Sequence, residues 1–354
     1  MAKFLMLSQI DRQILRSWRQ YAIEPRLARL TGRVIRTTGP RIAVVGNCQS
    51  YGVAYAMKLL DPSAQVDHYA AIGRARANMD ILVRTLKTYD YVFSHEVPGG
   101  HIPGGDSDEL CRRIPKTVMF PAIAFAAFHP DLIYLLDETR GYAQLFGPLG
   151  PYHSALAVFA FRKGLSLDEA NALFNRNVYE TLGYFDVWND AAHEFLEVCK
   201  TKFDMDLSNE LMNWARRGVF MYSIVHPKPY VLADIARRLF QKVGLDVREA
   251  NLDHYAIDDL ARAEIFPIYP EVGQRYGARG GYLFKMGNFH VSNGVGDFLT
   301  LPQYLSSCFK IYRSSDVNQI AHPRIDAWLA DAPLSETLTQ LARENLKAGL
   351  LPVL

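Results

Sequence analysis

The sequence has no apolar run of the roughly 18 residues needed to cross a bilayer, few cysteines and almost no net charge. Its 354 residues include 39 Lys or Arg and 37 Asp or Glu, which gives a formal charge of +2. This balance argues against a protein that coats nucleic acid. The four cysteines are far apart and form no Cys-x-x-Cys pair, so neither a disulfide scaffold nor a metal knuckle is expected. We therefore expect a cytoplasmic protein without a metal and without a nucleic-acid partner.

Several common nucleotide and metal motifs are also absent. The chain contains no P-loop, no Gly-x-Gly-x-x-Gly and no His-Glu-x-x-His. What it does contain is a hydrophobic fraction of 49%, which is ample for a folded core and excludes global disorder.

Basic residues concentrate at the N-terminal end. Residues 1–41 carry nine Lys or Arg and two acidic residues, and apolar residues recur at helical spacing between positions 10 and 22. We interpret 1–40 as a basic helical extension. Two hypotheses remain for it: a solvated helix packed on its own domain, or a peripheral contact with an assembly partner or with the anionic inner face of a membrane.

Short apolar runs that alternate with helical spacing predict a parallel α/β sheet domain of Rossmann or SGNH-like character over residues 41–150. The predicted strands are 41–45, 66–70, 89–93 and 117–120, and the predicted helices between them are 51–60 and 81–86. Residues 151–272 read as a helical portion packed on this sheet, with a capping box at Ser166–Glu169. Residues 273–354 read as an irregular C-terminal region closed by a helix over 334–346.

The strongest site candidate is the segment Gly46-Asn47-Cys48-Gln49-Ser50, between the first predicted strand and a helix. Ligands of parallel sheets bind outside the carboxyl ends of the strands, where a helix N-terminus directs unpaired N–H groups. These groups lower the pKa of a thiol and stabilise a developing oxyanion. The position therefore predicts Cys48 as a nucleophile, with its neighbours as the binding cradle.

A cysteine nucleophile needs a base, and four of the ten histidines stand at the ends of predicted elements. His95 follows the third strand, at the edge of the sheet expected to hold Cys48. His129, His153 and His226 stand next to prolines or helix starts. Sequence separation does not rank these four, so all remain candidates.

Two other classes of function stay open. Asp204-Met205-Asp206 resembles the Asp-x-Asp of metal-dependent glycosyltransferases, in which carboxylates hold Mn²⁺ against a nucleotide-sugar. A non-catalytic carbohydrate-assembly protein is the third hypothesis.

The start Ile42 to Ser50 resembles that of the WcbI-type capsular polysaccharide biosynthesis proteins. The likeness spans roughly residues 41–270, and its most specific part is the Gly-Asn-Cys-Gln element. Further stretches match in the same order: Phe120-Pro121, Phe128-His129-Pro130, Gly150 to Ser154, Ser166 to Ala170, Gly183 to Asp186 and Phe220 to Pro227.

This resemblance implies an acetyltransferase that binds coenzyme A and transfers acetyl from acetyl-CoA to a sugar of a capsular or related surface polysaccharide. It places Cys48 at the family's reactive cysteine. The acetyl group would travel through an acyl-Cys48 intermediate, or directly to a sugar hydroxyl with a histidine as base and Cys48 shaping the site.

Overall fold

The computed structural model describes residues 19, 23–31, 38–71, 78–97, 99–248, 251–287 and 297–352. The chain divides into two compact units. Unit 1 comprises residues 1–123, 196–210 and 228–258, and unit 2 comprises residues 124–195, 211–227 and 259–354. The expected division into four consecutive segments differs from this arrangement, because the chain passes from one unit to the other several times. The helix predicted between positions 10 and 22 lies almost entirely outside the described residues.

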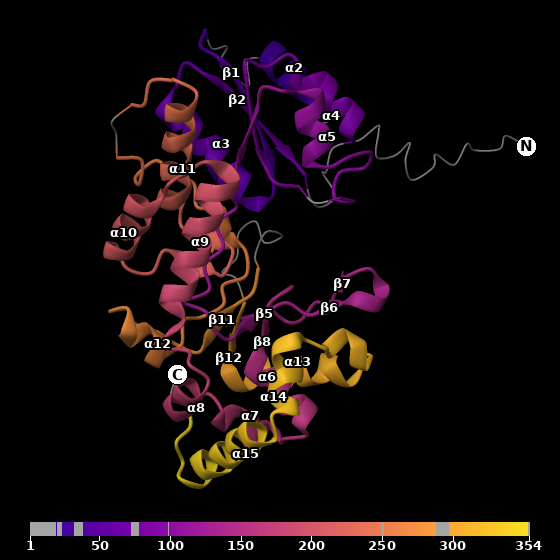
Figure 1. Cartoon of the computed structure of the whole chain (residues 1–354), viewed down its shortest axis with the longest axis vertical. Helices are drawn as coiled ribbons and strands as arrows, with labels where there is room; N and C mark the ends of the chain where they lie inside the picture. Colours follow the sequence, from indigo (N-terminus) through magenta and orange to yellow (C-terminus); the bar gives the residue numbers. More distant parts are fainter. Residues whose placement is uncertain are drawn as a thin grey trace, which may run out of the picture. The chain divides into compact units, whose positions relative to one another are not determined.

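A four-stranded parallel sheet forms the centre of unit 1, in the order β2-β1-β3-β4 (Figure 1). The strands are β1 (Arg41–Gly46), β2 (Gln65–Ala70), β3 (Tyr91–His95) and β4 (Thr117–Phe120). The side chains of β1 from Ile42 to Val45 are fully buried, as expected for a central strand covered on both faces. The predicted α/β sheet is thus confirmed, with β3 two residues later than expected.

Helices cover both faces of this sheet. α4 (Met79–Leu86) and α5 (Ser107–Arg113) pack on the face that presents Ala43 and Val45. α3 (Cys48–Leu60) covers the opposite face, with α11 (Pro229–Lys242) beside it (Figure 1). A β-carbon at Gly52 of α3 would lie 2.4 Å from Leu232 Cδ1, so the glycine permits the close approach of α11.

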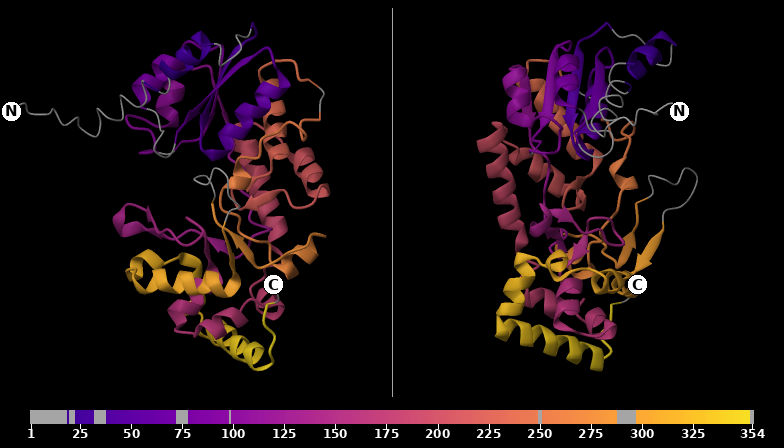
Figure 2. Two further views of the ribbon diagram at one scale, coloured as in Figure 1. Left: turned by 180° about the vertical axis from the view of Figure 1, so that it is seen from behind. Right: turned by 90° about the vertical axis from the view of Figure 1, so that its right-hand side faces the viewer.

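Unit 2 is built mainly from helices around one apolar core. α13 (Leu301–Arg313), α14 (Pro323–Ala330) and α15 (Ala332–Lys347) pack against α6 (Ala155–Lys163) and α7 (Leu167–Ala172) (Figure 2). The capping box predicted at Ser166–Glu169 is present at the start of α7. α13 and α14 lie in the region expected to be irregular, so that expectation was wrong there.

The remaining helices and strands complete the two units. The helices are α2 (Glu24–Leu30), α8 (Arg176–Thr181), α9 (Val187–Phe203), α10 (Ser208–Arg216), α12 (Pro270–Arg275), η3 (Glu138–Arg140), η4 (Leu260–Arg262) and η5 (Val317–Ile320). The strands are β5 (Leu132–Ile133), β6 (Leu136–Asp137), β7 (Ala143–Gln144), β8 (His153–Ser154), β9 (Met221–Ser223), β10 (His226–Pro227), β11 (Leu283–Lys285) and β12 (Phe298–Thr300). None of the helices in the described part of the chain is both long and apolar enough to span a bilayer.

Candidate functional site

The turn between β1 and α3 lies at the carboxyl edge of the sheet. Asn47 caps α3 with an extended backbone, and its Oδ1 accepts a hydrogen bond of 3.0 Å from the backbone N–H of Gln49. The helix therefore begins at Cys48, three residues earlier than the sequence pattern predicts. Cys48 is exposed, whereas Gln49 and Ser50 behind it are buried.

The electrostatics of the Cys48 thiol result from two opposing effects. The backbone N–H groups of Cys48 and Gln49 lower its pKa, as expected at a helix N-terminus. Although the residue keeps an exposed surface, the surrounding protein removes water from around its thiol, and this desolvation is the larger effect, which raises the pKa above the ordinary value. The expectation of a net lowered pKa was therefore wrong for this structure, and thiolate formation at neutral pH requires a base.

The side chain of Gln49 binds the backbone of Ile123. Its side-chain Nε2 donates to the carbonyl of Ile123 at 2.9 Å, and its Oε1 accepts from the Ile123 N–H at 2.8 Å. This pair of bonds fixes the segment that follows β4 against the first turn of α3. Because the amide is engaged at both ends and the Gln49 N–H is bound to Asn47, Gln49 serves the shape of the site more than the expected oxyanion cradle.

His95 lies directly beside Gly46, at the end of β3. A β-carbon added at Gly46 would be 2.7 Å from His95 Nδ1, so a glycine is required there. The ring packs on Phe120 with 4.1 Å between centroids and is only 1% exposed. Neither ring nitrogen has a hydrogen-bond partner among the described residues. Burial, with a smaller contribution from His68, lowers the pKa of His95 to about 3, so the ring is neutral at neutral pH.

His68 is the residue of this site that the sequence analysis missed. It lies on β2 opposite Val44, on the same face of the sheet as His95, and its Nε2 is 2.8 Å from Ser50 Oγ. Ser50 Oγ donates to the Asn47 carbonyl at 2.6 Å, which uses its only hydrogen. His68 Nε2 must therefore carry a proton and donate it to Ser50, which fixes the tautomer.

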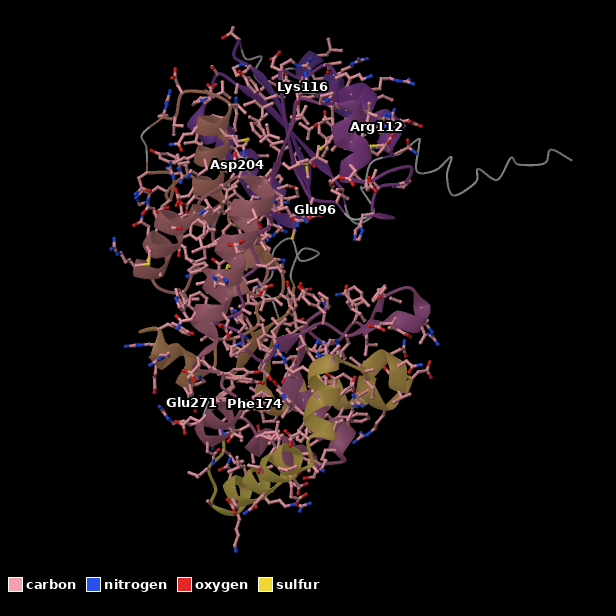
Figure 3. The ribbon with its side chains drawn as sticks, in the orientation of Figure 1. Glu96, Arg112, Lys116, Phe174, Asp204 and Glu271 are labelled. Atoms are coloured by element: carbon pink, nitrogen blue, oxygen red, sulfur yellow. The ribbon has the colours of Figure 1, made fainter. Side chains whose placement is uncertain are left out.

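Glu96 follows His95 in the sequence, but its carboxylate is paired with another residue. Its Oε2 lies 2.6 Å from Lys202 Nζ, and both side chains are about half exposed (Figure 3). The carboxylate thus serves a surface ion pair, which contributes little to stability.

The other three candidate histidines lie in unit 2, and each has its own contacts. His153 Nδ1 is 2.9 Å from the Tyr312 hydroxyl and its Nε2 is 3.0 Å from the Leu145 carbonyl, so both nitrogens are engaged. His226 has both ring nitrogens 3.3 Å from the Tyr152 hydroxyl. The two contacts of the His153 ring, with Tyr312 and Leu145, give this histidine a structural role.

His129 resembles His95 in its burial. It is 2% exposed, its Nδ1 has no partner among the described residues, and its other nitrogen donates to the backbone of Phe266. Burial lowers the pKa of His129 to about 3 and of His153 and His226 to about 4. The structure thus brings Cys48, His95 and His68 together at one sheet edge, and His129 and His226 remain candidates of unit 2.

The Asp204-Met205-Asp206 segment has the contacts of a helix start. Asp206 Oδ1 accepts from the Ser208 N–H at 3.0 Å and from its hydroxyl at 2.6 Å, which caps α10. Asp204 is exposed and pairs with Lys242 at 3.3 Å (Figure 3). Within the described ranges no group of three or more His, Cys, Asp or Glu side chains is placed to hold a metal ion.

Comparison with known families gives one match. A family model described as polysaccharide biosynthesis enzyme WcbI covers residues 41–248, which is more than half of the chain. The matched range begins with β1 and includes the turn at Cys48 and both histidines beside it. Searches of curated proteins and of solved structures find no match. The chain therefore belongs to the WcbI family of polysaccharide biosynthesis enzymes.

Proposed function

We propose that this polysaccharide biosynthesis enzyme is an acetyltransferase, which moves acetyl from acetyl-CoA to a sugar hydroxyl through Cys48 and His95. The observation that carries the proposal is the state of His95. It is a fully buried histidine with two unpartnered ring nitrogens, beside Gly46, which stands two residues before the exposed Cys48. No other described histidine combines these features.

Unpartnered buried nitrogens are unfavourable for folding. Leaving a buried polar group unsatisfied costs about 1–3 kcal/mol, and such groups concentrate where chemistry needs them. At neutral pH the ring is a neutral imidazole with one free lone pair that can accept a proton, but burial opposes its charged form, so in the proposed reaction it holds the proton only transiently. This suits Cys48, whose raised pKa means that the thiol must lose its proton to a neighbour before it attacks.

The proposed reaction has two steps, and the acetyl group is attached to Cys48 between them. In the first, His95 takes the Cys48 proton, the sulfur bonds to the thioester carbonyl carbon, and the bond to the CoA sulfur breaks. The CoA thiolate leaves with the proton from His95. In the second, His95 takes the proton of the sugar hydroxyl, whose oxygen bonds to the same carbon. The bond to Cys48 breaks, and the returning thiolate regains the proton.

Direct transfer is the alternative within the same class. There the histidine deprotonates the sugar hydroxyl, which attacks acetyl-CoA itself, and Cys48 only shapes the site. The two routes differ in whether an acetyl-enzyme accumulates when acetyl-CoA is supplied without an acceptor. Intact-protein mass analysis after rapid quenching separates them.

The capping role of Asp206 and the ion pair of Asp204 favour this proposal over a metal-dependent glycosyltransferase. A thermal-shift series with CoA, acetyl-CoA and nucleotide-sugars tests the choice, because a ligand that binds only the folded state raises the unfolding temperature. We expect CoA and acetyl-CoA to stabilise the protein and nucleotide-sugars with Mn²⁺ to have no effect. A rise in unfolding temperature with nucleotide-sugar and Mn²⁺ alone would support the glycosyltransferase hypothesis instead. If no ligand changed the unfolding temperature, the non-catalytic hypothesis would be supported.

A further inference from the structure

Unit 2 contains a cavity of about 400 Å³ that the site around Cys48 does not use. It is lined by residues of α8, of the turn after α8 and of α12: Arg176, Phe185, Asp186, Glu271, Gln274 and Arg275. Its volume lies within the range of roughly 300–1,000 Å³ that is typical of small-molecule sites.

Buried tyrosines hold one wall of the cavity in place. Glu271 is labelled in Figure 3. Its Oε2 accepts a hydrogen bond of 3.0 Å from the Tyr282 hydroxyl, which itself lies 2.8 Å from the Tyr179 hydroxyl. Tyr269, which precedes α12, donates to the buried carboxylate of Asp131 at 2.6 Å. The carboxylate of Glu271 is therefore oriented before any ligand binds.

Arg176, another lining residue, is held in place by two contacts. Its Nε lies 2.9 Å from Glu180, and its guanidinium lies over the ring of Phe185 at 5.5 Å from the centroid. A stacked and paired arginine loses little side-chain freedom when it binds a ligand, and it still has further N–H donors.

Three lining side chains have polar groups available for a ligand. Asp186, Gln274 and Arg275 make no side-chain hydrogen bond or ion pair to any residue that the structure describes. They offer a carboxylate acceptor, an amide with donor and acceptor ends, and a guanidinium fork. The lining thus offers both donors and acceptors.

The charges of the lining identify the chemical class of the ligand. Two arginines and two carboxylates give a formal lining charge of 2 − 2 = 0. A phosphate or nucleotide site would need a net positive lining, and a cation site a net negative one. A neutral ligand rich in hydroxyl groups, each both donor and acceptor, matches a lining of mixed donors and acceptors without net charge.

We propose that this cavity binds a neutral sugar unit of the polysaccharide on which the enzyme acts. The proposal rests on membership of a polysaccharide biosynthesis family and extends the acceptor part of the proposed function. It assigns recognition of the saccharide to α8 and α12, through residues separate from Cys48 and His95.

Saturation-transfer NMR on the full-length protein without acetyl-CoA tests this site. The probes are the methyl glycosides of glucose, galactose and mannose, with glucuronic acid and UDP as charged comparators. We expect saturation of at least one neutral glycoside. The variants Arg275→Ala and Asp186→Ala should each weaken its binding by roughly tenfold, the loss expected for a charged hydrogen bond. Arg313→Ala, an exposed arginine of α13 outside the cavity, is the matched control and should bind like the wild type.

Binding of none of the neutral glycosides, or equal binding by the two cavity variants and the wild type, would overturn the inference. So would binding of UDP or glucuronic acid alone. Circular dichroism should show that all three variants are folded, because the substituted side chains are exposed. The NMR readout involves no acetyl group. If the protein bound sugar but did not transfer acetyl through Cys48, only the proposed function would be refuted. If it transferred acetyl but did not bind sugar in this cavity, only this inference would be refuted.

Discussion

The ring of His95 lies against Gly46, so closely that a β-carbon on residue 46 would be 2.7 Å from Nδ1 and 2.9 Å from the His95 Cβ. Gly46 ends the central strand, and the chain turns there into the helix that begins with Cys48. The contact therefore couples the position of the turn to the position of the histidine. It also means that the absence of a side chain at residue 46 is a condition for the site.

Gly46→Ala should destabilise the protein by about 1–3 kcal/mol, because the added methyl group overpacks a rigid interior. The free energy of unfolding in urea measures this effect. Gly281→Ala is the control, since a β-carbon there meets nothing within 4 Å and should change stability little. In the double variant Gly46→Ala with His95→Gly the methyl group has room, because the ring and the His95 Cβ, which would lie 2.9 Å from the added β-carbon, are both removed. A Gly46→Ala penalty that is equally large with and without the His95 ring would contradict the contact.

His95→Leu should raise the stability of the protein and lower its activity. The leucine removes two unpartnered buried nitrogens, so we expect the free energy of unfolding to rise by about 1–3 kcal/mol. Loss of the proton carrier should lower the turnover rate of acetyl transfer by about 10²–10⁴-fold. Urea denaturation and a transfer assay measure the two quantities. A less stable variant that keeps its activity would show that His95 only fills space.

The buried histidines should make the protein sensitive to acid. The pKa is lowered to about 3 for His95 and His129 and to about 4 for His153 and His226, against 6.5 in the unfolded chain. Unfolding below pH 6.5 therefore takes up protons, and each histidine removes up to about 1.4 kcal/mol of stability per pH unit as the pH falls. His68, whose pKa burial also lowers to about 4, adds a fifth such group, and the raised pKa of Asp131 is one group that acts in the opposite direction.

Urea denaturation at pH 7.5, 6 and 5 measures this dependence. Stability should be nearly constant above pH 6.5 and fall steadily below it, and the fall should be less steep in His95→Leu by the equivalent of one proton. A stability that stays flat to pH 5 would contradict the burial of these rings as neutral groups.

His68 should act by holding the first turn of α3. His68→Ala removes the donor to Ser50 Oγ, and we expect it to reduce both the unfolding temperature and the turnover rate. His68→Gln keeps an N–H donor of similar reach and should restore part of both. If His68→Gln recovered stability without any activity, His68 would have a chemical role beyond positioning. Tyr51→Phe, a neighbour of the same ring, is the control for general disturbance.

Much of the sheet edge could be predicted because its signals are local. The apolar run of β1, its terminal glycine and the polar residues after it stand next to one another in the sequence, and so do β3 and His95. The chain order therefore placed Cys48 and His95 at one edge. The capping box Thr300–Gln303 at the start of α13 is equally local and was available as a signal for the helix that the prediction omitted.

The rest depends on pairings between distant segments. His68 lies inside a strand, and only the parallel register of β1 and β2 brings it to Ser50. His153 stands at an element end as a catalytic residue often does, but Tyr312, 159 positions away, occupies one of its nitrogens. Desolvation similarly reversed the expected shift of the Cys48 pKa, because it depends on surrounding segments that no local pattern reveals.

The central claim is that Cys48 carries the acetyl group. Intact-protein mass spectrometry after rapid quenching with acetyl-CoA alone tests it most directly, with Cys48→Ala as the comparison. We predict one acetyl group on the wild type, located on Cys48 by peptide mapping, and none on the variant. An unmodified wild type, together with a Cys48→Ala variant that still transfers acetyl to an acceptor, would contradict it.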